Sequence, residues 1–127
     1  APASAADSGA SVAGAGEAVY GWARAWSQQN VGRYLGFYAA GFEPENGMDR
    51  ASWRRLRQRR LTTPRSIEVT VSELTVEPRG AGRARARFVQ QYRSDRYADR
   101  VVKRLELVWE EGWKILRERV EAQLAGP

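Results

Sequence analysis

The sequence predicts an α+β fold in which helices cover one face of an antiparallel sheet, and three observations lead to this prediction. Seven aromatic side chains fall near helical spacing between Tyr20 and Phe42. From Ser66 onward, apolar and polar residues alternate with a period of two, which is typical of half-buried strands. The predicted helices all precede the predicted strands. Because the two kinds of element are segregated along the chain, we expect separate layers of helix and sheet.

Three helices are expected in the first half of the chain. Their predicted ranges are residues 17–29, 31–41 and 50–61. Val19, Trp22 and Trp26 recur at helical intervals, so they form the apolar face of the first helix. Asn30 and Asp49 directly precede the second and third helices, and both are residue types that cap helix N-termini.

Four long strands are expected in the second half. Their predicted ranges are residues 66–76, 83–93, 97–110 and 113–120. In the first strand, the alternation slips near Ser72 and Glu73. Short turn sequences, such as Glu111-Gly112 before the last strand, favour antiparallel neighbours. Strands of this length usually twist and curve, so a bent sheet is expected.

The chain is long enough for one domain with its own core. Residues 1–16 are nearly all Ala, Ser and Gly, so we expect a flexible linker there, then the domain at 17–121 and a tail at 122–127. The start lacks the basic and apolar segments of a signal peptide, and no later run is apolar enough to span a membrane. The linker-like start favours a C-terminal piece of a larger protein.

Cys and His are absent from the sequence, and this narrows the chemistry. The chain has no thiolate, no imidazole base and no zinc site of the Cys/His kind. No Asp-rich loop has the spacing of a calcium or magnesium site, so neither a metal nor another cofactor is expected. The formal net charge of +6 favours anionic partners.

Four segments together resemble the nuclear transport factor 2-like superfamily, also called SnoaL-like or ketosteroid isomerase-like. They are AWSQQNVGRYLGFYAAGF at 25–42, MDRASWRRLRQRRL at 48–61, QQYRSDRYADRVVKRLELV at 90–108 and EEGWKILRERV at 110–120. The resemblance is greatest to the small C-terminal domain of bacterial envelope proteins of the L,D-transpeptidase and tetratricopeptide-repeat types. It implies a cone, in which a strongly bent antiparallel sheet wraps around the N-terminal helices and leaves a pocket at the open end.

The resemblance implies a range of roles, because the superfamily includes isomerases, cyclases, dehydratases and members without catalysis. Its isomerase-type members hold an acidic base and acid donors in the pocket. No carboxylate here lies in a matching motif, so no catalytic residue is assigned. Asp49 is explained as a helix cap and Asp95 as a turn residue, and Glu118 is expected on the outer face of the sheet.

A pocket lined by aromatic and polar side chains is the first candidate site. On the strand at 83–93, Gln90 and Tyr92 share the inward phase with Phe88. The predicted pocket residues are Tyr34, Tyr38, Gln90, Tyr92, Trp109 and Arg117. The alternative is that the aromatic residues simply fill the cone as core, with each hydroxyl bonded internally. A buried Asp or Glu close to Tyr38 or Tyr92 would favour an enzyme.

An Arg-rich surface on the third helix is the second candidate site. Its predicted members are Arg50, Arg54, Arg55, Arg57 and Arg59. This surface suits an anionic polymer, but the lack of interleaved aromatic residues disfavours nucleic acid. The alternative is a solvated helix face. A further set of charged residues (Arg85, Arg87, Arg104, Glu106, Lys114 and Glu118) is expected to pair across the outer face of the sheet, which also offers a homodimer interface.

We therefore expect a non-catalytic binding or interaction module of a bacterial cell-envelope protein, periplasmic or envelope-associated. Its partners would be a small ligand or peptidoglycan fragment, other domains of the parent protein and a second copy of the chain. Two alternatives stay open. One is a small pocket enzyme of the isomerase or cyclase type, and the other is a binder of anionic polymers or nucleic acid through the third helix.

Overall fold

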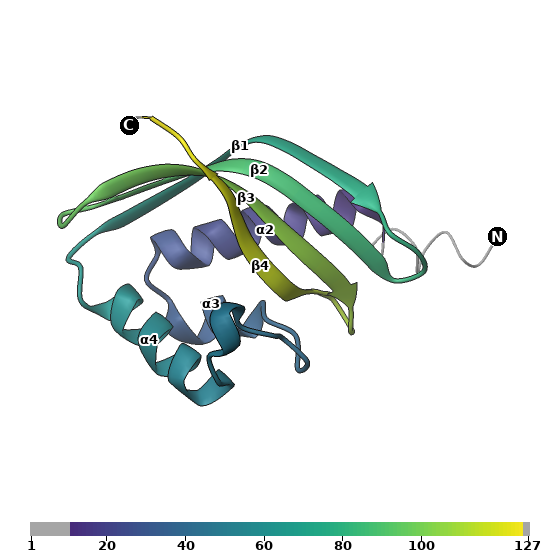
Figure 1. Ribbon diagram of the computed structural model, residues 1–127, viewed down its shortest axis with the longest axis horizontal. Coiled ribbons are helices and arrows are strands. Elements are labelled where there is room, and N and C mark those ends of the chain that lie inside the picture. The colour runs from purple at the N-terminus through teal and green to yellow at the C-terminus, as the bar shows by residue number, and fades with distance from the viewer. Residues whose placement is uncertain (1–10, 126–127) are drawn as a thin grey trace.

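The computed structural model in Figure 1 describes residues 11–125. In this part of the chain, all the helices precede the strands. The helices are α2 (Val12–Ser27), α3 (Val31–Gly36), the 3-10 helix η1 (Glu45–Gly47) and α4 (Arg50–Thr62). The strands are β1 (Ile67–Pro78), β2 (Arg83–Ser94), β3 (Ala98–Trp109) and β4 (Trp113–Gln123).

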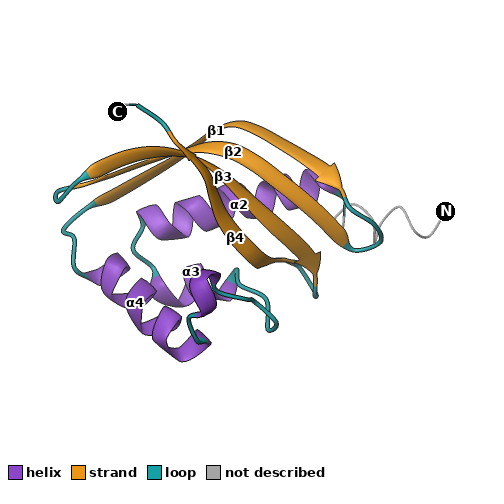
Figure 2. Cartoon of the chain, viewed as in Figure 1, coloured by secondary structure: helices purple, strands orange, loops and turns teal. Residues whose placement is uncertain are grey.

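The four strands form one antiparallel sheet in the order β1-β2-β3-β4. The sheet arches over α2, which lies along its concave face, while α3 and α4 lie at the open side (Figures 1 and 2). This is the predicted α+β cone. None of the described helices combines the length and the apolar character needed to cross a bilayer.

Helix α2 begins at Val12, so residues 12–16 are helical and the predicted linker at 1–16 is wrong for them. Ser11 caps the helix by accepting a hydrogen bond from the Gly14 backbone N–H. The small residues at this end allow a close approach to β1, because Ala15 is fully buried and Gly16 lies against Leu74. Residues 1–10 of the expected linker lie outside the described part of the chain.

Helix α3 ends at Gly36, earlier than the predicted end at Gly41. The chain then runs beside β4, where the Ala39 N–H donates to the Ile115 carbonyl at 2.8 Å and the Ile115 N–H donates to Phe37 at 2.7 Å. These bonds to the edge of the sheet replace the helical ones. Tyr38 still points inward and is buried.

The strand pairing is irregular in β1 and in β4. β1 has the predicted slip, with Glu73 at a φ of 54°. In β4, Glu106 pairs with Arg117 and Leu107 pairs with Ile115, so Leu116 is an extra residue in a bulge. The bulge shifts the alternation by one, and Glu118 therefore points inward, where it is 6% exposed. The expectation that Glu118 lies on the outer face is wrong.

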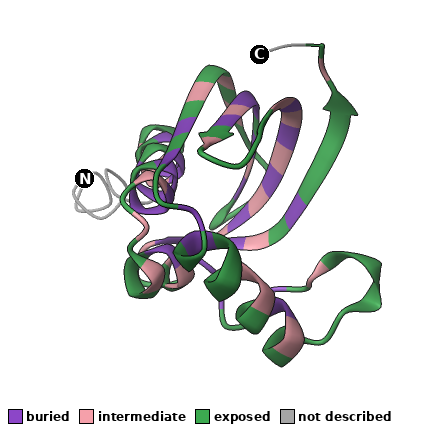
Figure 3. Ribbon diagram, turned by 90° about the vertical axis from the view of Figure 1, so that its left-hand side faces the viewer, coloured by how far each residue is buried: buried purple, intermediate pink, exposed green. Residues whose placement is uncertain are grey.

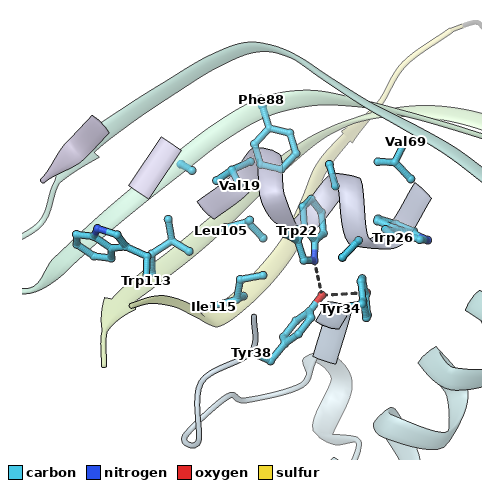
Figure 4. Close-up of a cluster of buried hydrophobic side chains, with 14 of the residues drawn as sticks. Val19, Trp22, Trp26, Tyr34, Tyr38, Val69, Phe88, Leu105, Trp113 and Ile115 are labelled. Carbon is cyan, nitrogen blue, oxygen red and sulfur yellow. Dashed lines mark hydrogen bonds between the residues drawn. The ribbon is translucent and has the colours of Figure 1, made fainter. Parts of the chain in front are cut away.

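The core lies between α2 and the inner face of the sheet (Figure 3). Trp22, Tyr34, Phe88 and Leu105 are at most 1% exposed, and the close-up shows them gathered around α2 (Figure 4). The aromatic stretch is therefore mostly core. β4 continues to Gln123, so the predicted tail at 122–127 begins as strand.

Charged side chains pair on the outer face of the sheet, as expected. Arg85 donates to Glu106 at 2.9 Å across β2 and β3. Arg87 and Arg104 both pair with Glu121 on β4, at 2.6 and 3.2 Å. These half-exposed and exposed pairs describe a solvated face with balanced charge.

Candidate functional site

A buried network of charged and hydroxyl groups lies at the open end of the cone. Its centre is the Glu118 carboxylate, whose Oε1 accepts from the Tyr38 hydroxyl at 2.7 Å. Glu118 Oε2 accepts from Lys103 Nζ at 2.6 Å and lies 3.6 Å from the guanidinium of Arg57. The side chains of Glu118, Lys103 and Arg57 are 4%, 6% and 17% exposed. We call these three residues the buried triad.

The hydrogen-bond directions around Tyr38 can be assigned from its single proton. Tyr38 gives that proton to Glu118, so it accepts from Trp22 Nε1 at 3.1 Å and from the Tyr34 hydroxyl at 3.0 Å (Figure 4). Tyr34 in turn accepts from Arg57 at 2.9 Å. Arg57, Tyr34, Tyr38 and Glu118 thus form one continuous chain of donors and acceptors.

Four separate elements bring the network together. Glu118 turns inward because of the bulge in β4 and lies opposite Leu105, and Lys103 lies two residues before Leu105 on β3 in the same inward phase. Arg57 reaches in from α4, and Tyr34 lies on α3. The cations rest on indole rings: Lys103 Nζ is 5.4 Å from the ring centre of Trp26 and the Arg57 guanidinium is 5.4 Å from that of Trp53.

The network strongly shifts the pKa values of its members. Burial alone would raise the pKa of Glu118, but the charges of Arg57 and Lys103 and the hydrogen bonds from Lys103 and Tyr38 lower it to about 2. Burial lowers the pKa of Lys103, while Glu118 opposes this shift. Burial raises the pKa of Tyr38 well above 10.0, and the negative charge of Glu118 adds to the effect. At neutral pH the Glu118 carboxylate is therefore ionised, and the hydroxyls of Tyr34 and Tyr38 keep their protons.

A cavity of about 460 Å³ opens beside the network, between α4 and the inner face of β2 and β3. We call it the main cavity. Trp26, Leu61 and Val101 contribute apolar wall, and Gln90 and Lys103 contribute polar groups. Its size and mixed lining are those of a small-molecule site.

Three side chains that line the main cavity each contain a buried polar atom without a partner. Trp26 Nε1, Arg57 Nε and Gln90 Oε1 have no hydrogen-bond partner among the described residues. Gln90 is 4% exposed and Trp26 is 8% exposed. Buried polar groups are nearly always paired, but these atoms are closed off in this conformation, so a ligand would reach them only after their side chains move.

A second cavity of about 200 Å³ adjoins the main cavity. It is lined by Phe42, Trp53 and Glu118, and the two cavities share Leu56, Arg57, Arg60, Lys103 and Val120. Both cations of the buried triad therefore line both spaces, whereas Glu118 lines the smaller one and not the main cavity.

The predicted pocket residues separate into three groups. Gln90 and Tyr92 line the main cavity. Tyr34 and Tyr38 lie in the buried network and not on the cavity wall. The placement of Trp109 and Arg117 in the pocket is wrong. Trp109 is 38% exposed at the end of β3, and Arg117, on the outer side of the bulge, is exposed and pairs with Glu43 at 2.8 Å.

The predicted Arg surface is also corrected at one position. Arg57 points inward into the buried triad, because it lies one turn after Trp53 on the covered side of α4. Arg54, Arg55 and Arg59 are exposed, and Arg50 is exposed while it donates to the carbonyls of Ala40 and Ala39. A role of these four residues in binding an anionic partner stays a prediction.

The sequence reasoning missed Lys103 and Glu118. The inward direction of Lys103 could have been predicted from the alternation, since it shares the inward phase of Val101, Leu105 and Leu107. The signal for Glu118 is weaker: the adjacent apolar residues Ile115 and Leu116 interrupt the alternation and mark the bulge.

Comparisons with known proteins agree with this fold. Bd1075 from Bdellovibrio bacteriovorus superposes with a TM-score of 0.75 at 25% identity, over 86% of this chain and 39% of that one. A variant of the helical cell shape determining protein Pgp2 from Campylobacter jejuni gives 0.73 at 19% identity, over 80% and 38%. The chain thus spans less than two-fifths of these two proteins.

A putative dehydratase of the NTF2-like family from Streptomyces avermitilis gives a TM-score of 0.74 at 16% identity, over 90% of this chain and 96% of that one. The comparison with curated proteins found no match. The family described as the Cds6 C-terminal NTF2-like domain matches residues 15–119. Since that match covers most of the sequence, the chain belongs to the family of Cds6 C-terminal NTF2-like domains.

Proposed function

We propose that this domain is a non-catalytic ligand-binding module of a larger bacterial cell-envelope protein, located in the periplasm. The observation that carries the proposal is the main cavity, whose lining combines apolar surface with the polar side chains of Arg57, Gln90 and Lys103. Such a combination is typical of sites that bind and orient a small molecule.

A peptidoglycan-type fragment is the ligand class that we favour. Its sugar rings would stack on aromatic faces, and Tyr97 offers one at the mouth of the cavity, 5.1 Å from Tyr92. Its hydroxyl and amide groups would bond to the polar side chains of the wall, such as Gln90 and Ser94. The fold likeness to a helical cell shape determining protein supports an envelope context.

Calorimetric titration of the full chain with soluble disaccharide-peptide fragments tests this proposal. We expect saturable binding that Tyr97→Ala weakens by up to about tenfold, the upper end of one aromatic contact. Tyr20→Ala is the matched control, because Tyr20 is also an exposed tyrosine (43%) but lies on α2, away from the cavity. Absence of binding, or equal loss in both variants, would overturn the proposal.

An isomerase-type or cyclase-type enzyme is the second candidate, and one observation favours it: a buried carboxylate, Glu118, lies 2.7 Å from the Tyr38 hydroxyl. Three features place it second. Both carboxylate oxygens are already bonded, the low pKa of Glu118 leaves it no proton to donate at neutral pH, and Glu118 does not line the main cavity.

Proton NMR of the same fragments after incubation with the protein separates the two candidates, because it detects isomers and ring closure that leave the mass unchanged. A binding module returns the fragments unchanged. Conversion that is lost in Glu118→Gln would favour the enzyme.

A further inference from the structure

The buried triad contains two cations and one carboxylate, and this imbalance points to the charge of the ligand. We propose that the main cavity binds a small organic anion whose charged group docks against Arg57 and Lys103. The inference rests on the proposed ligand-binding function and adds the chemical class of the ligand.

Without a bound anion, this excess of buried positive charge is unfavourable. Arg57 and Lys103 share Glu118 as their nearest acid, with both cations largely removed from water. A buried charge without a counter-charge is unfavourable, so a structure that holds one is stabilised when an anion arrives. The indole rings of Trp26 and Trp53 compensate only in part, since a cation–π contact is weaker than a buried ion pair.

The side chains at the rim of the main cavity also carry an excess of positive charge. Three further cationic side chains, those of Arg59, Arg60 and Arg96, line the cavity, against one acidic side chain, that of Asp99. Field lines converge in such a cleft and raise the local concentration of anions. The whole lining therefore selects for negative charge, from the mouth to the triad.

The polar side chains of the lining refine the ligand further. The Arg57 guanidinium and the Lys103 ammonium are donors, which suit the oxygens of a carboxylate, sulfonate or phosphate. The Gln90 amide both donates and accepts, and suits a hydroxyl or amide group of the ligand. The apolar wall requires a ring or hydrocarbon body between these groups.

Two dyes that differ by one sulfonate group test the inference. Anilinonaphthalene sulfonate is an anion, and phenylnaphthylamine is the same ring system without the charge. Fluorescence titration of the full chain should give the anion at least about tenfold tighter binding than the neutral dye.

The variant Arg57→Met should bring the two affinities to within about twofold, because it leaves a neutral Lys103–Glu118 pair while the neutral dye keeps its apolar contacts. Arg54→Gln is the matched control: it removes an exposed charge from the same helix and should leave the preference intact. If Arg57→Met fails to fold, Gln90→Glu supplies the missing negative charge from the wall and should abolish the preference in the same way.

Each outcome decides a different claim. If neither dye binds, the proposed function fails together with the inference. If both dyes bind equally to the wild type, the ligand site stands and its anionic character is wrong. If the preference survives Arg57→Met, the anion is held by the rim of the cavity or by the surface of α4 and not by the triad, and the inference is overturned.

Discussion

At the residue scale, Glu118 is the counter-charge for two buried cations. Glu118→Gln would keep the shape of the side chain but leave Lys103 and Arg57 without an anion. We expect a loss of about 3–5 kcal/mol in the free energy of unfolding, measured with urea at neutral pH. Glu121→Gln on the same strand is the control: it breaks outer-face pairs and should cost at most about 1 kcal/mol. Equal costs would contradict the buried network.

The stability of the domain at acidic pH should depend on the charge of Glu118. The folded-state pKa of Glu118 is about 2, below its ordinary value of 4.5, so the ionised carboxylate stabilises the fold above pH 4.5. That contribution is lost as the pH falls from 4.5 towards 2. Urea unfolding at several pH values should show this decline in the wild type and a flatter profile in Glu118→Gln. Parallel profiles would contradict the assignment.

The side of the sheet to which each side chain points could be predicted from the sequence wherever a strand is regular. Gln90 and Tyr92 follow the alternation of β2 and were placed correctly. Trp109 has the inward phase of β3 but is its last residue, where it stays 38% exposed and packs edge-on against the buried Trp113. Arg117 and Glu118 were both inverted by one bulge, which depends on long-range pairing that alternation alone does not encode.

At the scale of elements, the bulge in β4 is what turns Glu118 inward. Leu116 is the residue that the bulge accommodates, so deleting it should leave a regular strand in which Ile115 and Glu118 still face inward and Arg117 outward. In this background, Glu118→Gln should still cost about 3–5 kcal/mol by urea unfolding. If the substitution becomes nearly neutral, Glu118 has turned outward and Leu116 is not the extra residue of the bulge.

The ends of the helices were harder to predict than their faces. Val12 starts α2 within an Ala/Gly-rich segment that has no apolar stripe, because its small residues pack against β1. α3 ends at Gly36, because the following backbone bonds to β4. Both ends are fixed by contacts with strands distant in the sequence.

The exposed arginines of α4 allow a separate test of polymer binding. If Arg54, Arg55 and Arg59 form only a solvated face, filter binding should show no salt-sensitive affinity for DNA or RNA. Affinity that falls steeply with salt and is lost in the triple Gln variant would support the alternative role.

At the scale of the whole molecule, the order of elements and the strand period were sufficient to predict an α+β fold with a bent sheet, and the family resemblance added the cone. The apolar spacing in the helices and strands is local and strongly periodic, so tertiary contacts change little of the predicted secondary structure. A pocket at the open end was predicted, but the part of its wall that α4 supplies was not, because it depends on where α4 sits against β2 and β3. Homodimer formation stays a prediction. Light scattering should give twice the chain mass of 14.3 kDa, and a monomer at high concentration would contradict it.

The central claim is that the main cavity holds a small ligand, and the indole N–H signals of the tryptophans test it most directly. The sequence has five tryptophans: Trp26 lines the main cavity with an unpartnered Nε1, and Trp109 lies exposed at the end of β3. During a titration with anilinonaphthalene sulfonate followed by nitrogen–proton correlation NMR, we predict a saturable shift of the Trp26 signal and none at Trp109. A Trp26 signal that stays fixed while the dye binds would contradict the account.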